Sequence, residues 1–140
     1  MPGSLLALLL GSLTSVVSAT TWMTDSEIHA AFAGRTIDGI YATGLTFTET
    51  YRADGGVAYE EPGRQLSGRW SVVAGSFCTI YDDAISGGCF RVQRMSGNCY
   101  EFHFVAKDED EAALRPDRTA WTARGWRSGE RSTCDGLPTV

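Results

Sequence analysis

Hydrophobic and polar positions alternate along most of the chain after residue 34. Phe47, Glu49 and Tyr51, for example, alternate with threonines at positions 46, 48 and 50, and a period of two is typical of a half-buried strand. Similar segments recur about every ten residues, with turn signals such as Asp54-Gly55-Gly56 and Pro62-Gly63 between them. The pattern predicts an antiparallel all-β domain of about seven or eight strands.

The hairpins allow neighbouring strands to be aligned. A two-residue turn at Ala74-Gly75 places Val72 opposite Phe77, and the alternation then places Phe77 opposite Phe90. A turn centred on Ser96 would place Phe90 opposite Phe102 and Val92 opposite Tyr100. The predicted inner face consists of Trp70, Val72, Phe77, Tyr81, Phe90, Val92, Tyr100, Phe102 and Phe104.

Sequential hairpins favour an up-and-down barrel that resembles a small lipocalin-like domain, with a β-sandwich as the second choice. The sequence leaves open whether the barrel interior is filled or hollow. One short helix is expected before the sheet, because Thr24 and Glu27 have capping-box spacing and Ile28 and Phe32 share a helical face. The last strand is expected at residues 118–124.

The N-terminus has the pattern of a secretory signal. The apolar run from Leu5 to Val17 is shorter than the about 20 residues that span a bilayer, and Val17-Ser18-Ala19 suits a signal peptidase. We therefore divide the chain into a signal peptide (1–19), a helical segment (20–34), a β-domain (35–127) and a polar tail (128–140). No membrane span is expected after cleavage. No Lys or Arg precedes the run, so an uncleaved N-terminal segment stays open as an alternative.

All four cysteines lie after residue 19, and an even number in an exported chain indicates two disulfides. Their separations of 11, 10 and 35 residues do not suit structural zinc, whose ligand pairs lie closer together. The hairpin register places Cys78 opposite Cys89, whereas Cys99 lies roughly 13 Å from Cys89 by the strand rise, which is too far for a bridge. We predict Cys78–Cys89 and Cys99–Cys134, with Cys134 holding the tail, and a periplasmic or secreted location.

Composition and charge exclude some functions. The 140 residues are 43% hydrophobic and 21% charged, as in ordinary globular proteins. The net charge of −5 argues against a nucleic-acid partner, since phosphate binding needs a basic surface. The sequence contains no serine-hydrolase, zinc-protease or phosphate-loop motif, and we expect no catalytic residues, cofactor or metal.

Three groups of residues are candidates for catalysis or metal binding. His103 beside Glu101 could form an acid–base pair, but a solvated sheet face is preferred, with Glu101 paired to Arg91 across the strands. Asp82 and Asp83 could be paired catalytic carboxylates, and the acidic run at 108–111 could bind calcium. Polar loops are preferred for both.

The late segment combines tryptophan with arginine, which are residue types enriched at binding hot spots. Possible partner-binding residues are Trp121, Arg124, Trp126 and Arg127. The alternative is that Trp121 completes the core and Trp126 shields the barrel mouth. A ligand site is expected either at this segment or at an open end of the barrel.

Residues 24–105 contain several short motifs, each of which occurs once. They are Gly34-Arg35-Thr36, Phe47-Thr48-Glu49-Thr50-Tyr51, Gly68-Arg69-Trp70-Ser71-Val72, Phe77-Cys78-Thr79-Ile80-Tyr81, Gly87-Gly88-Cys89-Phe90-Arg91-Val92 and Gly97-Asn98-Cys99-Tyr100-Glu101-Phe102. This order resembles a group of short exported proteobacterial proteins with no assigned function. The resemblance implies export and a small β-fold, and it brings no catalytic residues.

These observations favour an exported, non-catalytic protein that binds a small ligand or another protein. Two alternatives remain. One is an accessory subunit of an envelope complex, held by an uncleaved N-terminal segment. The other is a hydrolase of unrecognised type that uses His103, Glu101 or the acidic loops.

Overall fold

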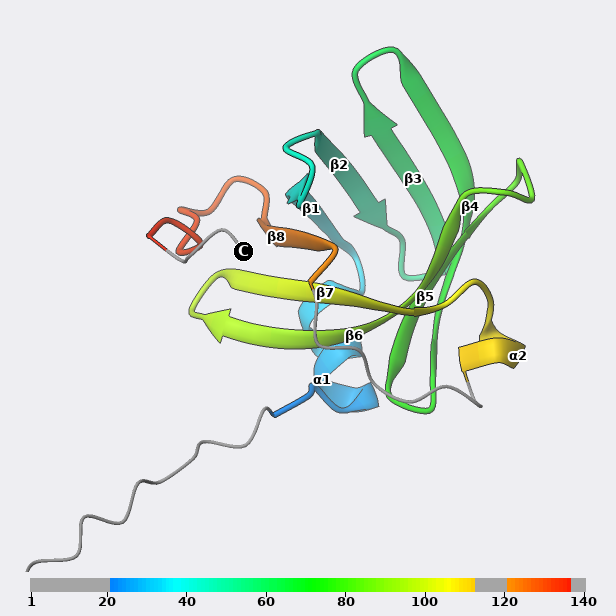
Figure 1. The fold of residues 1–140 in the computed structure, drawn as a ribbon, viewed down its shortest axis with the longest axis horizontal. Coiled ribbons are helices and arrows are strands. Elements are labelled where there is room, and N and C mark those ends of the chain that lie inside the picture. Colours follow the sequence, from blue (N-terminus) through cyan, green and yellow to red (C-terminus); the bar gives the residue numbers. More distant parts are fainter. Residues whose placement is uncertain (1–20, 113–120, 137–140) are drawn as a thin grey trace, which may run out of the picture.

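The chain folds into a closed antiparallel barrel in which eight strands follow one another in sequence order (Figure 1). The computed structural model describes residues 21–112 and 121–136, so the predicted signal peptide at 1–19 lies outside the described residues. The closed barrel confirms the first of the two predicted architectures. The elements are α1 (Asp25–Phe32), β1 (Arg35–Tyr41), β2 (Thr46–Tyr51), β3 (Gly56–Glu61), β4 (Arg64–Val73), β5 (Ser76–Tyr81), β6 (Gly87–Ser96), β7 (Cys99–Ala106), α2 (Glu109–Ala112) and β8 (Ala123–Arg127).

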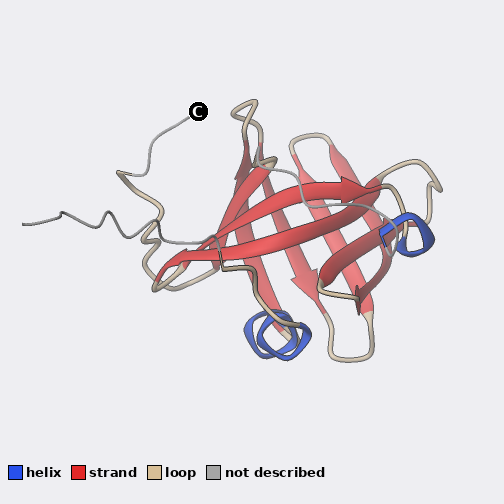
Figure 2. Ribbon diagram, turned by 60° about the horizontal axis from the view of Figure 1, so that its bottom comes forward, coloured by secondary structure: helices blue, strands red, loops and turns tan. Residues whose placement is uncertain are grey.

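Pairing between β1 and β8 closes the barrel, and two glycines lie directly opposite each other at this seam, Gly39 and Gly125. A β-carbon at Gly39 would overlap the ring of Phe47, and one at Gly125 would crowd Ile37. The missing side chains therefore let inward-pointing apolar groups approach the wall closely. Figure 2 shows the strands curving around the barrel, with both helices outside it.

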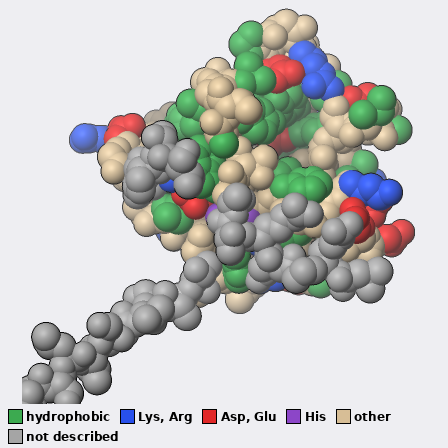
Figure 3. Space-filling view, in the orientation of Figure 1, with side chains coloured by type: hydrophobic (Ala, Val, Ile, Leu, Met, Phe, Trp, Pro, Cys, Tyr) green, Lys and Arg blue, Asp and Glu red, His purple; other side chains and the backbone are tan. Residues whose placement is uncertain are grey.

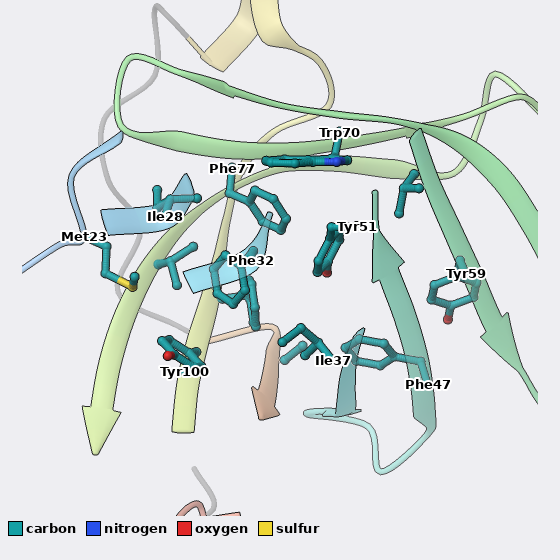
Figure 4. Packing of buried hydrophobic residues seen from close by; sticks show 14 of the residues in the cluster. Met23, Ile28, Phe32, Ile37, Phe47, Tyr51, Tyr59, Trp70, Phe77 and Tyr100 are labelled. Carbon is teal, nitrogen blue, oxygen red and sulfur yellow. The ribbon is translucent and has the colours of Figure 1, made fainter. Parts of the chain in front are cut away.

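Helix α1 covers one end of the barrel. Its capping box is formed as predicted, since the Thr24 N–H donates to the Glu27 carboxylate at 2.7 Å and Thr24 accepts from the Glu27 N–H. Ile28 and Phe32 on its inner face are fully buried. Figure 4 shows the Phe32 ring among the inward-pointing aromatic residues, and its centroid lies 5.1 Å from that of Phe77. The helix thus closes this end with apolar side chains.

The register of β4, β5 and β6 agrees with the prediction. Val72 lies opposite Phe77, and Phe77 lies opposite Phe90. Ala74 and Gly75 form the predicted two-residue turn, with φ angles of 48° and 78°, as required where a tight turn follows the twist of a hairpin. The turn therefore fixes the register of β4 and β5.

The predicted register between β6 and β7 is wrong by two residues. Phe90 lies opposite Phe104 rather than Phe102, and Val92 lies opposite Phe102 rather than Tyr100. The chain turns at Gly97 and Asn98 rather than around Ser96, so that Ser96 pairs with Cys99, and an irregularity between Arg94 and Ser96 then moves the register back by one residue. Because side chains alternate with a period of two, a shift of two leaves every side chain on its predicted face.

Both predicted disulfides are present. Cys78–Cys89 joins β5 to β6 with the Cα atoms 4.0 Å apart, and Cys99–Cys134 ties the tail to β7 with the Cα atoms 4.9 Å apart. Two disulfides are compatible with an oxidising compartment. Among the described residues, no helix has the length and apolar character needed to cross a membrane.

Two segments differ from the prediction. The acidic run at 108–111 enters the short helix α2 rather than a loop, and Ala112 of this helix packs on the outer cluster around Cys78–Cys89. The last strand, β8, runs from Ala123 to Arg127 rather than over residues 118–124, and positions 118–120 lie outside the described residues. Alternation of hydrophobic and polar residues does not determine at which of these neighbouring positions the last strand begins and ends.

Candidate functional site

The end of the barrel away from α1 contains a cavity of about 250 Å³. Hydrophobic side chains gather there in the space-filling view (Figure 3). The lining is mainly aromatic and includes Phe47, Tyr51, Phe77, Tyr81, Phe90 and Phe102. The interior is therefore partly hollow, which answers a question that the sequence left open.

The end of the cavity that faces α1 meets the packed core. Tyr51 and Phe77 line the cavity, and both also contact Phe32 of α1, with ring centroids 5.9 and 5.1 Å from the Phe32 ring. Toward the loops, the lining includes Ser86 and Thr122, which are only half-buried. The cavity thus has an aromatic floor and a more polar rim.

Glu49 is the one carboxylate among the described residues that line this cavity. It points inward from β2 between Phe47 and Tyr51, and only 7% of its surface is exposed. The hydroxyl of Tyr51 donates to one carboxylate oxygen, and the hydroxyl of Tyr81 donates to the other. Both oxygens of the carboxylate are therefore held by tyrosines on two different strands.

The surroundings of Glu49 alter its acidity. Burial raises the pKa of Glu49 from its ordinary value of 4.5 to about 7, although the hydrogen bond from Tyr51 lowers it. Burial also raises the pKa of Tyr51 well above its ordinary value, and the charge of Glu49 adds to this effect. Glu49 thus titrates near neutral pH, while the Tyr51 hydroxyl keeps its proton.

A second set of tyrosines lies beside the first. The Tyr41 hydroxyl donates to the Tyr59 hydroxyl at 3.1 Å, and Tyr59 donates to Glu61 at 2.9 Å. Burial, and to a smaller extent the charge of Glu49, raise the pKa of Tyr41. The rings of Tyr59 and Tyr81 lie 5.5 Å apart, so the two sets form one continuous aromatic wall.

A separate polar cluster lies on the outer side of β7 and β8. His103 Nε2 lies 3.2 Å from Glu101, and Arg124 donates to the other Glu101 oxygen at 2.8 Å. The three residues are only 4–6% exposed. Trp22 contacts the His103 ring, with the centroids 5.0 Å apart. The predicted solvated face is therefore wrong here, because a segment before α1 covers it.

The predicted Arg91–Glu101 pair is also corrected. Glu101 forms its ion pair with Arg124, which belongs to the strand on the other side of β7. Arg91 lies opposite His103, and its guanidinium carbon is 5.4 Å from the centre of the Trp22 ring. The wrong register between β6 and β7 led to the mistaken partner.

The four predicted partner-binding residues are placed differently from one another. Arg124 is buried and lies over the Trp121 ring at 4.4 Å. Trp126 is half-buried and lines a shallow depression, and Arg127 forms an ion pair with Glu130 at 3.1 Å. The structure thus does not bring them together as one exposed patch, and their role in binding stays a prediction.

The acidic groups form local contacts. Hydrogen bonds from the Ser86 hydroxyl and backbone lower the pKa of Asp83 to about 2, and Glu109 forms an ion pair with Arg69. Within residues 21–112 and 121–136, no group of three or more His, Cys, Asp or Glu side chains is arranged to hold a metal. These contacts fit loops and a helix end that are fixed by hydrogen bonds.

Glu49 was not singled out from the sequence, although a signal was present. The alternation in residues 46–51 places Glu49 on the same face as Phe47 and Tyr51. A charged residue on a face of large apolar side chains is rarely buried unless it is paired. Glu49 was therefore a better candidate for a functional residue than His103 or the carboxylates at 82–83 and 108–111.

Fold and site together define a small closed β-barrel with an interior cavity that carries a buried carboxylate. Comparison of the sequence with models of known protein families finds no match, and comparison with curated proteins finds none.

Proposed function

We propose that this protein is an exported, non-catalytic binding protein that holds one small molecule inside its barrel. The observation that carries the proposal is the cavity of about 250 Å³, which the described residues line with aromatic rings and one buried carboxylate. Ligand sites are commonly concave and mainly apolar, with a few polar groups that orient the ligand. Mouths of β-barrels are a frequent location for such sites.

The volume supports a ligand of one or two rings. An apolar cavity of about 150 Å³ can hold benzene, whereas sites for drug-sized molecules start at about 300 Å³. An eight-stranded barrel has room for interior side chains or for one small ligand. A small aromatic or compact aliphatic molecule fits these limits, and a long-chain lipid does not.

The polar groups favour binding over the hydrolase alternative. His103 and Glu101 lie on the outer wall, and Arg124 already engages Glu101. The cavity lining includes the hydroxyls of Thr79, Ser86 and Thr122, and no described His lies beside them in the lining. A nucleophile and a base in contact, as hydrolysis by a serine would need, are thus not found in the described part of this cavity.

Export is part of the proposal and has two supports. One is the N-terminal pattern of residues 1–19, and the other is the pair of disulfides, which are typical of oxidising compartments. The resemblance to short exported proteins agrees with this assignment. Intact-mass measurement of the exported protein tests it, because cleavage removes residues 1–19.

Binding is tested by filling the cavity. Thr79 is buried on the inner face of β5 and lines the cavity, whereas the alternation places the next residue, Ile80, on the outer wall. Neutral aromatic probes such as 2-phenylethanol and indole are titrated while amide chemical shifts are recorded by NMR. We expect Thr79→Phe to weaken probe binding roughly tenfold or more, since its ring occupies the space.

The matched control is Ile80→Phe, which adds a ring to the same strand on the opposite face. It should bind the probes like the unaltered protein. Shift changes should centre on the cavity strands β2, β5, β6 and β7. If no probe binds, or if Thr79→Phe binds as well as Ile80→Phe, the cavity is not the binding site.

A further inference from the structure

We infer that the ligand carries a positively charged amine, which pairs with Glu49 while its apolar body lies among the surrounding rings. This inference rests on the proposed function and names the chemical class of the molecule that the cavity takes. It is carried by the contacts of Glu49, by its lack of a charged partner in the described chain, and by the aromatic lining.

The contacts of Glu49 are those of an ionised carboxylate. One oxygen accepts from Tyr51 and the other accepts from Tyr81. A protonated carboxyl group would itself be a donor at one oxygen, whereas an ionised carboxylate only accepts. Two hydroxyl donors aimed at two different oxygens therefore favour a negative charge at this place.

That charge has no counter-ion among the described residues. Burial and the Tyr51 hydrogen bond account for the altered acidity of Glu49, without a contribution from a described Arg, Lys or His. A buried charge is normally paired, because its removal from water is costly. A cationic ligand would provide the missing partner and would recover part of this cost on binding.

The rings around the carboxylate favour the same class of ligand. Phe47, Tyr51 and Tyr81 all line the cavity beside Glu49, and the faces of aromatic rings attract ammonium groups. Rings arranged around a site that binds an ammonium ion are the usual means of recognising alkylated amines. The lining thus combines the charge of Glu49 with aromatic rings that attract a cation.

Other headgroups fit less well. A carboxylate or phosphate would approach Glu49 with the same sign of charge, and the described lining contains no Arg or Lys to offset the repulsion. An alcohol could donate to Glu49, but it would leave the charge uncompensated. The order of affinity expected for ligands of equal size is therefore amine, then alcohol, then carboxylate.

Binding of an amine should also depend on pH. Beyond Tyr59 lie Glu61, which accepts from the Tyr59 hydroxyl, and Arg64, which pairs with Glu61 at 3.4 Å. The ionisable groups that face or adjoin Glu49 itself are Tyr51 on its own strand, Tyr59 on β3, Tyr81 on β5 and Tyr41 on β1. All four are tyrosines, which are neutral below about pH 10. Glu49 itself, with a pKa of about 7, is therefore the group that changes charge between pH 5.5 and pH 8.

The test compares three probes that share one phenyl ring and a short chain: 2-phenylethylamine, 2-phenylethanol and phenylacetate. Their affinities are measured at pH 8, where an alkylamine is protonated, with unaltered protein, Glu49→Gln and Thr79→Phe. The readout is the ratio of amine to alcohol affinity. We expect a ratio of roughly ten or more for the unaltered protein, a ratio near one for Glu49→Gln, and weak binding of every probe to Thr79→Phe.

The outcomes separate this inference from the proposed function. If the alcohol binds as tightly as the amine and Thr79→Phe abolishes both, the cavity is a ligand site but its ligand is not a cation. A preference for phenylacetate would overturn the inference in the same way. If none of the three probes binds, the proposed function itself is wrong, and the inference falls with it.

A second measurement keeps the test decisive if Glu49→Gln does not fold. The unaltered protein is titrated with the amine and the alcohol at pH 8 and at pH 5.5. Protonation of Glu49 should lower the amine affinity roughly tenfold or more at the lower pH, while the alcohol affinity changes little. An amine affinity that is the same at both values would contradict the assigned role of Glu49.

Discussion

Replacing Glu49 by glutamine should make the ligand-free protein more stable at alkaline pH. Glu49 has an ordinary pKa of 4.5 in the unfolded chain and a pKa of about 7 in the barrel, because burial disfavours its charge. Between these values the folded protein binds more protons than the unfolded chain does. The free energy of unfolding therefore falls as pH rises through this interval, and it levels off above it.

The magnitude follows from the displacement of the pKa. A displacement from 4.5 to about 7, at about 1.4 kcal/mol per pH unit, gives a loss of about 3 kcal/mol between pH 4 and pH 8. Glutamine carries no charge, but it is a poorer acceptor for the two tyrosine hydroxyls, at a cost of about 1 kcal/mol. Glu49→Gln should therefore be about 2 kcal/mol more stable than the unaltered protein at pH 8 and slightly less stable at pH 4.

Urea unfolding at several pH values measures this difference. Asp83, with a pKa of about 2, titrates below this range, and the other ionisable groups are left unchanged by the substitution. Their contributions are common to both proteins, so the difference between the two stabilities isolates Glu49. If the two stability curves run parallel from pH 4 to pH 8, the carboxylate is not buried and uncompensated as described.

Three further predictions concern stability and are also checked by urea unfolding. Trp70→Ala should cost about 3–5 kcal/mol, because the buried indole packs against the core rings and its N–H donates to a backbone carbonyl at 2.8 Å; an unchanged midpoint would contradict its inward placement. Glu101→Ala should cost about 3–5 kcal/mol, since it removes the buried carboxylate to which Arg124 donates, and a loss below 1 kcal/mol would indicate that the pair is open to water. Replacing Cys78 and Cys89 together by alanine should cost about 3 kcal/mol, from the smaller entropy of the cross-linked unfolded chain; a variant as stable as the parent would contradict the presence of that bridge.

The barrel was predictable where one local feature fixed the pairing of the strands. The two-residue turn after Val73 set the register of β4 and β5, and the predicted match of Phe77 with Phe90 then aligned the two cysteines. At the next hairpin the turn lies at Gly97 and Asn98 rather than around Ser96, and this position, together with an irregularity near residue 95, gives a pairing that differs from the prediction by two residues. Alternation cannot detect such a shift, because it returns every side chain to the same face.

Burial on the outer wall was not predictable from the strands alone. His103 and Glu101 alternate with inward aromatic residues, as they would on a face open to water. Trp22, which precedes the helix, contacts His103, and Arg124 reaches Glu101 from β8. Coverage of this kind depends on where non-neighbouring segments meet in space, and no local pattern in β7 encodes it.

The cavity depends on the same kind of information. Sequence alternation shows that Glu49 faces inward, but the space beside it depends on the sizes of side chains contributed by strands all around the barrel. Ala123 and Thr79, for example, are small inner residues on strands that are far apart in sequence, and both line the cavity. Hollow space of this kind is a property of the closed barrel and of no single strand.

The placement of Glu49 agrees better with the proposed role in binding than with a role in folding. An apolar residue of similar size would fill this position without the loss of about 3 kcal/mol that the displaced pKa implies, and small domains are stable by only about 5–15 kcal/mol. Two tyrosines from different strands nevertheless hold both of its oxygens, so the carboxylate is fixed in place rather than merely tolerated. Local choices that lower stability concentrate at functional sites, where a ligand offsets them. An oriented charge beside an aromatic cavity is such a choice, and the cation that we infer would offset its cost.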